Sequence, residues 1–87
     1  MNNNDYTQKE RLVNNTISSQ IIYTVKEVSQ ILKTNIDYVY SLRKAGLLPF
    51  IKIGQYKVMH KSLIQFLEKY EGYDLTDPFN IKKLNDN

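Results

Sequence analysis

The sequence predicts one small domain that is mainly α-helical and carries a short β-hairpin. Apolar residues recur at helical spacing in three stretches between Val25 and Tyr70. Two short extended segments flank Gly54, between the second and the third of these stretches. The 87 residues are enough for one domain only.

The first helix is predicted over residues 25–32. Thr24 and Glu27 have the spacing of a capping box, in which each side chain satisfies a free N–H group at the start of the helix. Tyr23, just before this box, is placed to act as a hydrophobic staple. One face carries the apolar residues that we expect to be buried, namely Val25, Val28, Ile31 and Leu32.

A second helix is predicted after a short turn at Lys33 and Thr34. Asn35 is its expected N-cap, and Gly46 ends it where a left-handed backbone is favoured. Two helices joined by so short a turn are typical of a helix-turn-helix. One face of this helix is expected to carry Ile36, Val39 and Leu42, with Arg43 at its edge. The opposite face carries Asp37, Tyr40, Ser41 and Lys44, and Tyr38 and Ala45 lie on the flank.

The β-hairpin and a third helix complete the expected domain. Residues 49–53 and 57–59 read as strands, with Gly54 and Gln55 as a two-residue turn. The third helix is predicted over residues 62–70 and ends near Gly72. Its expected core residues are Leu63, Phe66 and Leu67.

The domain is expected to occupy residues 21–71, between a flexible polar arm over residues 1–20 and a tail over residues 72–87. Thr7 to Glu10 has a second capping-box pattern, which allows a short helix in the arm. In the tail, Asp77 followed by Pro78 can begin a short helix from Phe79 to Leu84.

Composition excludes several classes of function. The chain has no cysteine and a single histidine, so we expect no disulfide, no metal site and no cysteine or serine–histidine catalysis. We predict neither an enzyme nor a cofactor. The polar N-terminus and the absence of a long apolar run predict a cytoplasmic, soluble protein with no membrane partner.

Positive charge is concentrated in the predicted domain. Residues 21–70 carry a net charge of +5, whereas residues 1–20 sum to zero and residues 71–87 to −2. Such a distribution is compatible with an ordinary solvated surface, but it favours a polyanionic partner such as nucleic acid.

The order and spacing of these elements resemble the excisionase-like, MerR-type winged helix-turn-helix DNA-binding domains. The resemblance covers residues 22–70, and it implies a bacterial, nucleoid-associated protein. It implies that the second helix enters the major groove and that the hairpin, the wing, touches the DNA backbone or the minor groove. The matching positions are Tyr23 to Val28, Ile31, Leu32, Val39, Tyr40, Leu42, Gly46, Leu48, Pro49, Lys52 to Gly54, Leu63, Phe66 and Leu67.

This chain departs from the family pattern at the start of the second helix. Many relatives have Ser-Arg-Ser-Thr there and another arginine one turn later, where this chain has residues 35–38, Asn-Ile-Asp-Tyr, and then Ser41. Since arginine is the commonest reader of guanine, we expect little guanine readout from this helix. The wing also has Gln55-Tyr56-Lys57 where relatives often have arginines.

The candidate DNA-binding residues lie on two elements. Those on the second helix are Asn35, Asp37, Tyr38, Tyr40, Ser41 and Lys44, and those on the wing and its flank are Lys52, Gln55, Tyr56, Lys57 and Lys61. Other roles remain open for some of them, because Asn35 can serve only as a cap, Asp37 can serve the helix dipole and Tyr40 can pack under the wing. His60 is expected to be an exposed loop residue near phosphate.

Three functions remain open. The first is an excisionase-type architectural protein that binds AT-rich repeats of a mobile element, bends the DNA and helps a tyrosine-family integrase to excise, with self-association on DNA. In that case Phe79, Ile81 and Leu84 of the tail are candidates for contacts with the integrase or a neighbouring copy. The second is a regulator of transcription or plasmid replication with the same fold. The third, suggested by Asp37 and the missing arginines, is a protein-interaction adaptor that has lost DNA affinity.

Overall fold

The structure is a computed structural model that describes residues 20–85. The predicted arm, including the capping box at Thr7 to Glu10, lies outside the described residues apart from Gln20. The helices and strands are, in chain order, β2 (Ile22–Thr24), α1 (Val25–Ile31), α2 (Ile36–Lys44), β3 (Ile51–Ile53), β4 (Gln55–Met59), α3 (His60–Tyr70), β5 (Tyr73–Asp74) and β6 (Lys82–Lys83).

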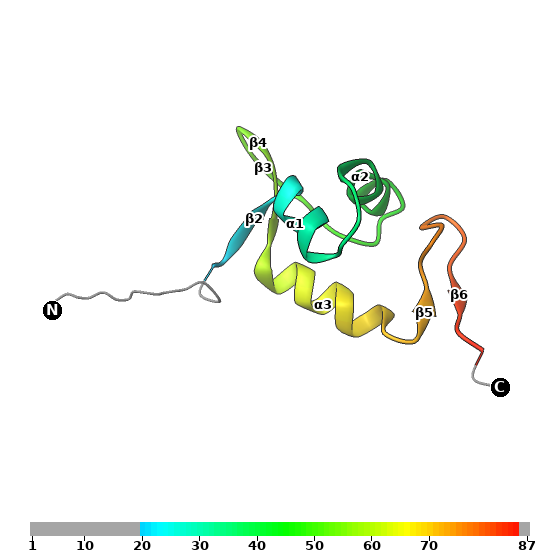
Figure 1. Cartoon of the computed structure of the whole chain (residues 1–87). Coiled ribbons are helices and arrows are strands. Elements are labelled where there is room, and N and C mark those ends of the chain that lie inside the picture. Colours follow the sequence, from blue (N-terminus) through cyan, green and yellow to red (C-terminus); the bar gives the residue numbers. More distant parts are fainter. Residues whose placement is uncertain (1–19, 86–87) are drawn as a thin grey trace, which may run out of the picture.

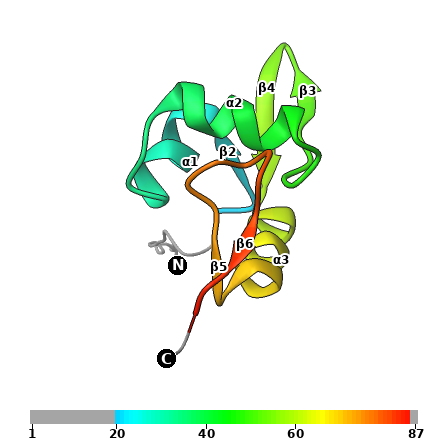
Figure 2. The ribbon, with the colours of Figure 1, turned by 90° about the vertical axis from the view of Figure 1, so that its right-hand side faces the viewer.

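These elements form a winged helix-turn-helix, so the predicted fold class is confirmed. In Figure 1, α3 runs beneath α1 and α2, the β3–β4 hairpin projects near the start of α3, and the β5–β6 hairpin lies at its other end. The turned view in Figure 2 shows the loop between β5 and β6 reaching toward α2. We call the β3–β4 hairpin the wing.

Both predicted helix starts of the helix-turn-helix are confirmed. Thr24 Oγ1 accepts a hydrogen bond from the Glu27 backbone N–H at 3.0 Å, and Glu27 Oε1 accepts one from the Thr24 N–H at 2.8 Å. Asn35 Oδ1 accepts from the Tyr38 N–H at 2.8 Å. The second helix ends before Gly46, which has φ +78°, as its glycine predicts. These local hydrogen bonds fix the two helices on either side of a short turn.

The sheet has three strands in the order β2-β4-β3, with both pairs antiparallel. Tyr23 was expected only to act as a hydrophobic staple before α1, but Ile22–Thr24 form the edge strand β2. Tyr23 stands opposite Val58, which is fully buried. The central strand β4 thus ties the wing to the start of the helix-turn-helix.

The predicted two-residue turn at Gly54 and Gln55 is wrong, because Ile53 pairs with Gln55 and leaves Gly54 alone at the tip. Gly54 has φ +72°, a conformation that glycine adopts without strain. The predicted turn would have placed Lys52 opposite Lys57, whereas Lys52 stands opposite Tyr56. A shift of this kind reverses which face of the hairpin each side chain occupies.

The core lies between the helices and the inner face of the sheet. It consists of Val25, Val28, Val39, Leu42, Leu48, Val58, Leu63 and Phe66. Leu48 and Val58 were not among the predicted core residues, because one follows a helix and the other belongs to a short strand. Conversely, Ile31 and Leu67 were predicted to be buried but are 46% and 41% exposed. The buried face of α1 carries Val25, Val28 and Ser29, and Ile31 lies to one side of that face.

The predicted helix over residues 79–84 is wrong, and this part of the chain forms the β5–β6 hairpin. Asp77 does accept from the Phe79 N–H, at 3.0 Å, but its backbone carbonyl accepts from the Asn80 N–H at 2.9 Å. Asp77 and Pro78 therefore occupy the first two positions of a β-turn, which are also favoured by these residue types.

Candidate nucleic-acid interface

The outward face of α2 carries three of the predicted site residues in accessible positions. Asp37 and Lys44 are exposed, and Ser41 is half-buried. The Ser41 hydroxyl donates to the Asp37 backbone carbonyl at 3.1 Å. Asp37 lies in the first turn, where a negative charge complements the helix dipole. Asn35 caps this helix, and its side-chain oxygen is occupied in doing so.

Tyr38 and Tyr40, both candidates for DNA contacts, lie on different sides of α2. Residues two positions apart in an α-helix are separated by about 200° around the helix axis. The Tyr38 hydroxyl donates to the Leu75 backbone carbonyl in the β5–β6 loop. Tyr38 therefore packs against the tail, away from the wing.

Tyr40 joins an aromatic cluster between α2 and the wing. Its ring centroid lies 5.8 Å from that of Phe50 and 6.1 Å from that of Tyr56, and the Phe50 and Tyr56 centroids are 5.8 Å apart. Tyr40 thus packs beneath the wing, one of the two roles left open for it. These tilted and edge-to-face contacts hold the wing against α2.

Two cationic side chains lie against this cluster. The guanidinium carbon of Arg43 is 4.6 Å from the Tyr56 centroid and 5.9 Å from the Phe50 centroid. Lys52 Nζ is 5.1 Å from the Tyr56 centroid. Arg43 was not among the predicted site residues, although its position three residues after Tyr40 places it on the same side of α2.

The wing carries lysines on both of its faces. Lys52 and Tyr56 form a cross-strand pair on the inner face, and Ile51 and Lys57 form the next pair on the outer face. The Lys57 ammonium donates to the Ile53 backbone carbonyl at 3.2 Å, near the tip. Gln55 is exposed beside Gly54.

The remaining flank residues begin α3. Lys61 is exposed in its first turn. His60 was expected in an exposed loop, but it is the half-buried first residue of α3, and its Nδ1 lies 2.8 Å from the Tyr23 hydroxyl. This hydrogen bond links α3 to β2, so His60 has a structural role.

A cleft of about 340 Å³ opens between α1, the start of α2 and the wing. Predicted residues Tyr40, Lys52, Gln55 and Tyr56 line it. Lys26 adds a positive charge that the sequence analysis did not select, since a lysine inside a capping box looks like ordinary helix surface. The structure therefore brings together one side of α2, the inner face of the wing and α1.

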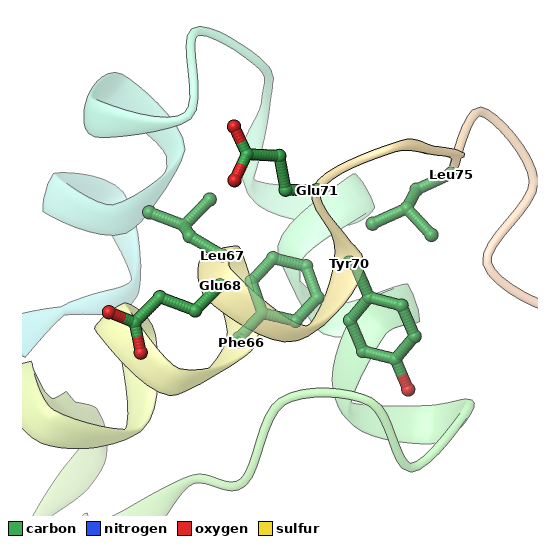
Figure 3. Close-up of a pocket in the computed structure, with 6 residues that line it drawn as sticks. All are labelled: Phe66, Leu67, Glu68, Tyr70, Glu71 and Leu75. Carbon is green, nitrogen blue, oxygen red and sulfur yellow. The ribbon is translucent and has the colours of Figure 1, made fainter. Parts of the chain in front are cut away.

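A second, largely apolar groove lies at the other end of α3, against the tail. Figure 3 shows its lining, which consists of Phe66, Leu67, Glu68, Tyr70, Glu71 and Leu75. None of the predicted site residues lines this groove. A neighbouring groove is lined by several residues, and Tyr38 is the one predicted site residue among them. In the tail, Phe79 and Leu84 are 65% and 55% exposed, and Ile81 is half-buried.

Ionisable groups with displaced pKa values lie at the tail. Burial raises the pKa of Tyr38, and the nearby negative charge of Asp74 raises it further. The pKa of Asp74 is lowered because its carboxylate accepts from the Thr76 hydroxyl at 2.6 Å and from the Thr76 N–H at 2.9 Å. Both shifts arise from contacts at the junction between the tail and α2, and neither has an evident part in the interface.

The fold and this interface define a protein of the winged helix-turn-helix class. A family model described as a helix-turn-helix domain matches residues 22–70. The chain belongs to this family of DNA-binding helix-turn-helix domains, and its membership indicates binding to double-stranded DNA. No curated protein and no solved structure matches the chain.

Two further features are absent from the described part of the chain. Among residues 20–85, no helix has the length and apolar character needed to cross a membrane. Within the same range, no group of three or more histidine, cysteine or acidic side chains is arranged to hold a metal ion.

Proposed function

We propose that this protein binds double-stranded DNA with the outward face of α2 in the major groove and the wing beside it. The observation that carries this proposal is the continuous surface formed by α2 and the wing within a helix-turn-helix domain. Lys44 on α2 and Lys52 and Lys57 on the wing supply positive charge for phosphate contacts. The proposed role is binding, not catalysis.

The positions of the wing lysines favour a geometry in which the tip of the wing inserts edge-on into a groove of the DNA. A hairpin lying flat on one strand would gain most from cations on a single face. Lys52 and Lys57 occupy opposite faces, so each can reach a different phosphate backbone when the tip stands between them. Such recognition depends on groove width more than on base identity, which suits AT-rich DNA with a narrow minor groove.

A binding experiment tests this function. Replacing Lys52 and Lys57 together with glutamine should weaken binding to all duplexes and reduce the slope of log K against log salt by about 1.8, which corresponds to two phosphate contacts. The matched control is Lys33→Gln, because Lys33 is an exposed lysine in the turn between α1 and α2. Weak binding of the unaltered protein with no salt dependence would contradict the proposal.

We further propose that the biological role is that of an excisionase of a mobile element. The resemblance of residues 22–70 and the limited means of base readout on α2 support an architectural protein that bends DNA for a tyrosine-family integrase. Phe79 and Leu84, both exposed in the tail, are the proposed integrase contacts.

A regulator of transcription or replication with the same fold is the competing role. Deleting the gene and measuring excision and transcription separately distinguishes the two. Loss of excision with unchanged transcription supports the excisionase role, and the reverse result supports the regulator. Footprinting of the neighbouring attachment region gives the binding site in either case.

A further inference from the structure

Arg43 and Lys52 come from different elements but lie at the same aromatic ring. Arg43 is in the last turn of α2, and Lys52 is in β3 of the wing. Both of their cationic groups lie within 5.1 Å of the ring centroid of Tyr56 in β4. The ring attracts each cation, while the two like charges repel each other.

Within the described part of the chain, no acidic side chain neutralises either charge. Across residues 20–85, the structure records no ion pair for Arg43 or for Lys52, and both residues are exposed. A guanidinium that rests on a ring keeps N–H donors at its edge, and these suit the oxygens of a phosphate. An anion that approaches this place meets two cations whose positions the ring restricts in advance.

We propose that Arg43 and Lys52, held at the Tyr56 ring, form a binding site for the DNA phosphate backbone where one strand passes between α2 and the wing. This site rests on the proposed function, since it requires that α2 and the wing approach the same duplex. It adds to the wing lysines an arginine on α2, and it assigns Tyr56 as the residue that positions both cations.

The proposed site explains why Arg43 contacts the Tyr56 ring, a contact that has no use in reading base edges. Arg43 points to the wing and not to the outward face of α2, so it is poorly placed to read a base edge. Its contribution should therefore be the same for every DNA sequence. The alternative is that Arg43 only fastens the wing to α2, and the two roles differ in their dependence on salt.

The test compares full-length variants for binding to a duplex that contains the site found by footprinting and to a random duplex. Arg43→Gln should weaken both interactions to a similar extent and reduce the salt slope by about 0.9, which corresponds to one phosphate. Arg43→Lys, which keeps the charge, should retain the slope of the unaltered protein. Lys69→Gln is the matched control, because Lys69 Nζ lies 5.5 Å from the Tyr70 centroid at the far end of α3.

A second measurement covers the case in which Arg43→Gln disturbs the wing. Single phosphates of the duplex are replaced one at a time by uncharged methylphosphonates, and binding of the unaltered protein and of Arg43→Lys is measured. Replacement at one phosphate should weaken binding of the unaltered protein by about tenfold. It should weaken binding of Arg43→Lys less, since lysine lacks the paired donors of arginine.

The outcomes separate this site from the proposed function. If the protein binds duplexes with a steep salt slope but Arg43→Gln leaves slope and affinity unchanged, Arg43 is a fastening residue and the site is refuted, while the proposed function stands. If the unaltered protein shows no salt-dependent binding to any duplex, both are refuted.

Discussion

The hydroxyl of Tyr38 forms a hydrogen bond with a residue that is distant in sequence, the carbonyl of Leu75. We predict that Tyr38→Phe lowers the free energy of unfolding by about 1 kcal/mol, because it leaves a partly buried carbonyl without this donor. Urea denaturation measures the change. Tyr73→Phe is the control, since Tyr73 is exposed and its ring would keep its contact with Tyr70. Equal effects of the two variants would contradict a specific role for the Tyr38 hydroxyl.

The raised pKa of Tyr38 predicts a dependence of stability on alkaline pH. Burial and the charge of Asp74 favour the neutral phenol in the folded state. Its stabilising contribution is therefore complete below the unfolded-state pKa of about 10 and is lost as the pH rises through the higher folded-state pKa. Between about pH 8 and pH 11, the melting temperature should fall more steeply with pH for the unaltered protein than for Tyr38→Phe.

Residue roles could be predicted from sequence when the partner lies within one helical turn. The caps made by Thr24, Glu27 and Asn35 depend on residues three positions apart, so their spacing was sufficient. Tyr38 and His60 each bond to a residue 37 positions away. No local pattern indicates such a partner, and for this reason Tyr38 was selected only as a candidate for DNA contacts and His60 was expected in an exposed loop.

At the scale of elements, the wing depends on one central strand. Val58 in β4 is fully buried between α-helical and β neighbours, whereas Ile53 near the tip is 59% exposed. We predict that Val58→Ala lowers the free energy of unfolding by about 2 kcal/mol, through two lost methyl groups and the cavity they leave. Ile53→Ala should change it by about 0.5 kcal/mol or less. Similar losses in chemical denaturation would contradict the assignment of Val58 to the core.

The elements predicted correctly were those with a strong helical period, and the errors fell on short strands and turns. Gly54 was correctly placed at the tip of the wing, but glycine is compatible with more than one turn length. The choice between them decides whether Lys52 and Lys57 share a face. Asp77 and Pro78 likewise suit the start of a helix and a β-turn equally well. For Asp77 and Pro78, only the packing of the tail against α2 and α3 decides between a helix and a β-turn.

At the scale of the whole molecule, charge and structure divide the protein into two regions. The α2 and wing surface belongs to the part with net positive charge, and the acidic Glu68 and Glu71 line the groove beside the tail. A polyanion approaching the protein is attracted by the first region and repelled by the second. This arrangement would leave the tail accessible to another protein while DNA is bound.

The tail was expected to lie outside the domain over residues 21–71, and in the structure it contacts that domain. Leu75 packs against the core, and Pro78 is buried. We predict that deleting residues 73–87 lowers the free energy of unfolding by about 2–3 kcal/mol, since the apolar surface of these side chains and of the adjoining part of α3 would meet water. Duplex affinity and its salt slope should change little at a temperature where both forms are folded, because α2 and the wing remain intact. Calorimetry and DNA binding on the same two proteins check both statements. A truncated chain with full stability would show that the tail is an appendage, and one that is stable but unable to bind would place DNA contacts in the tail.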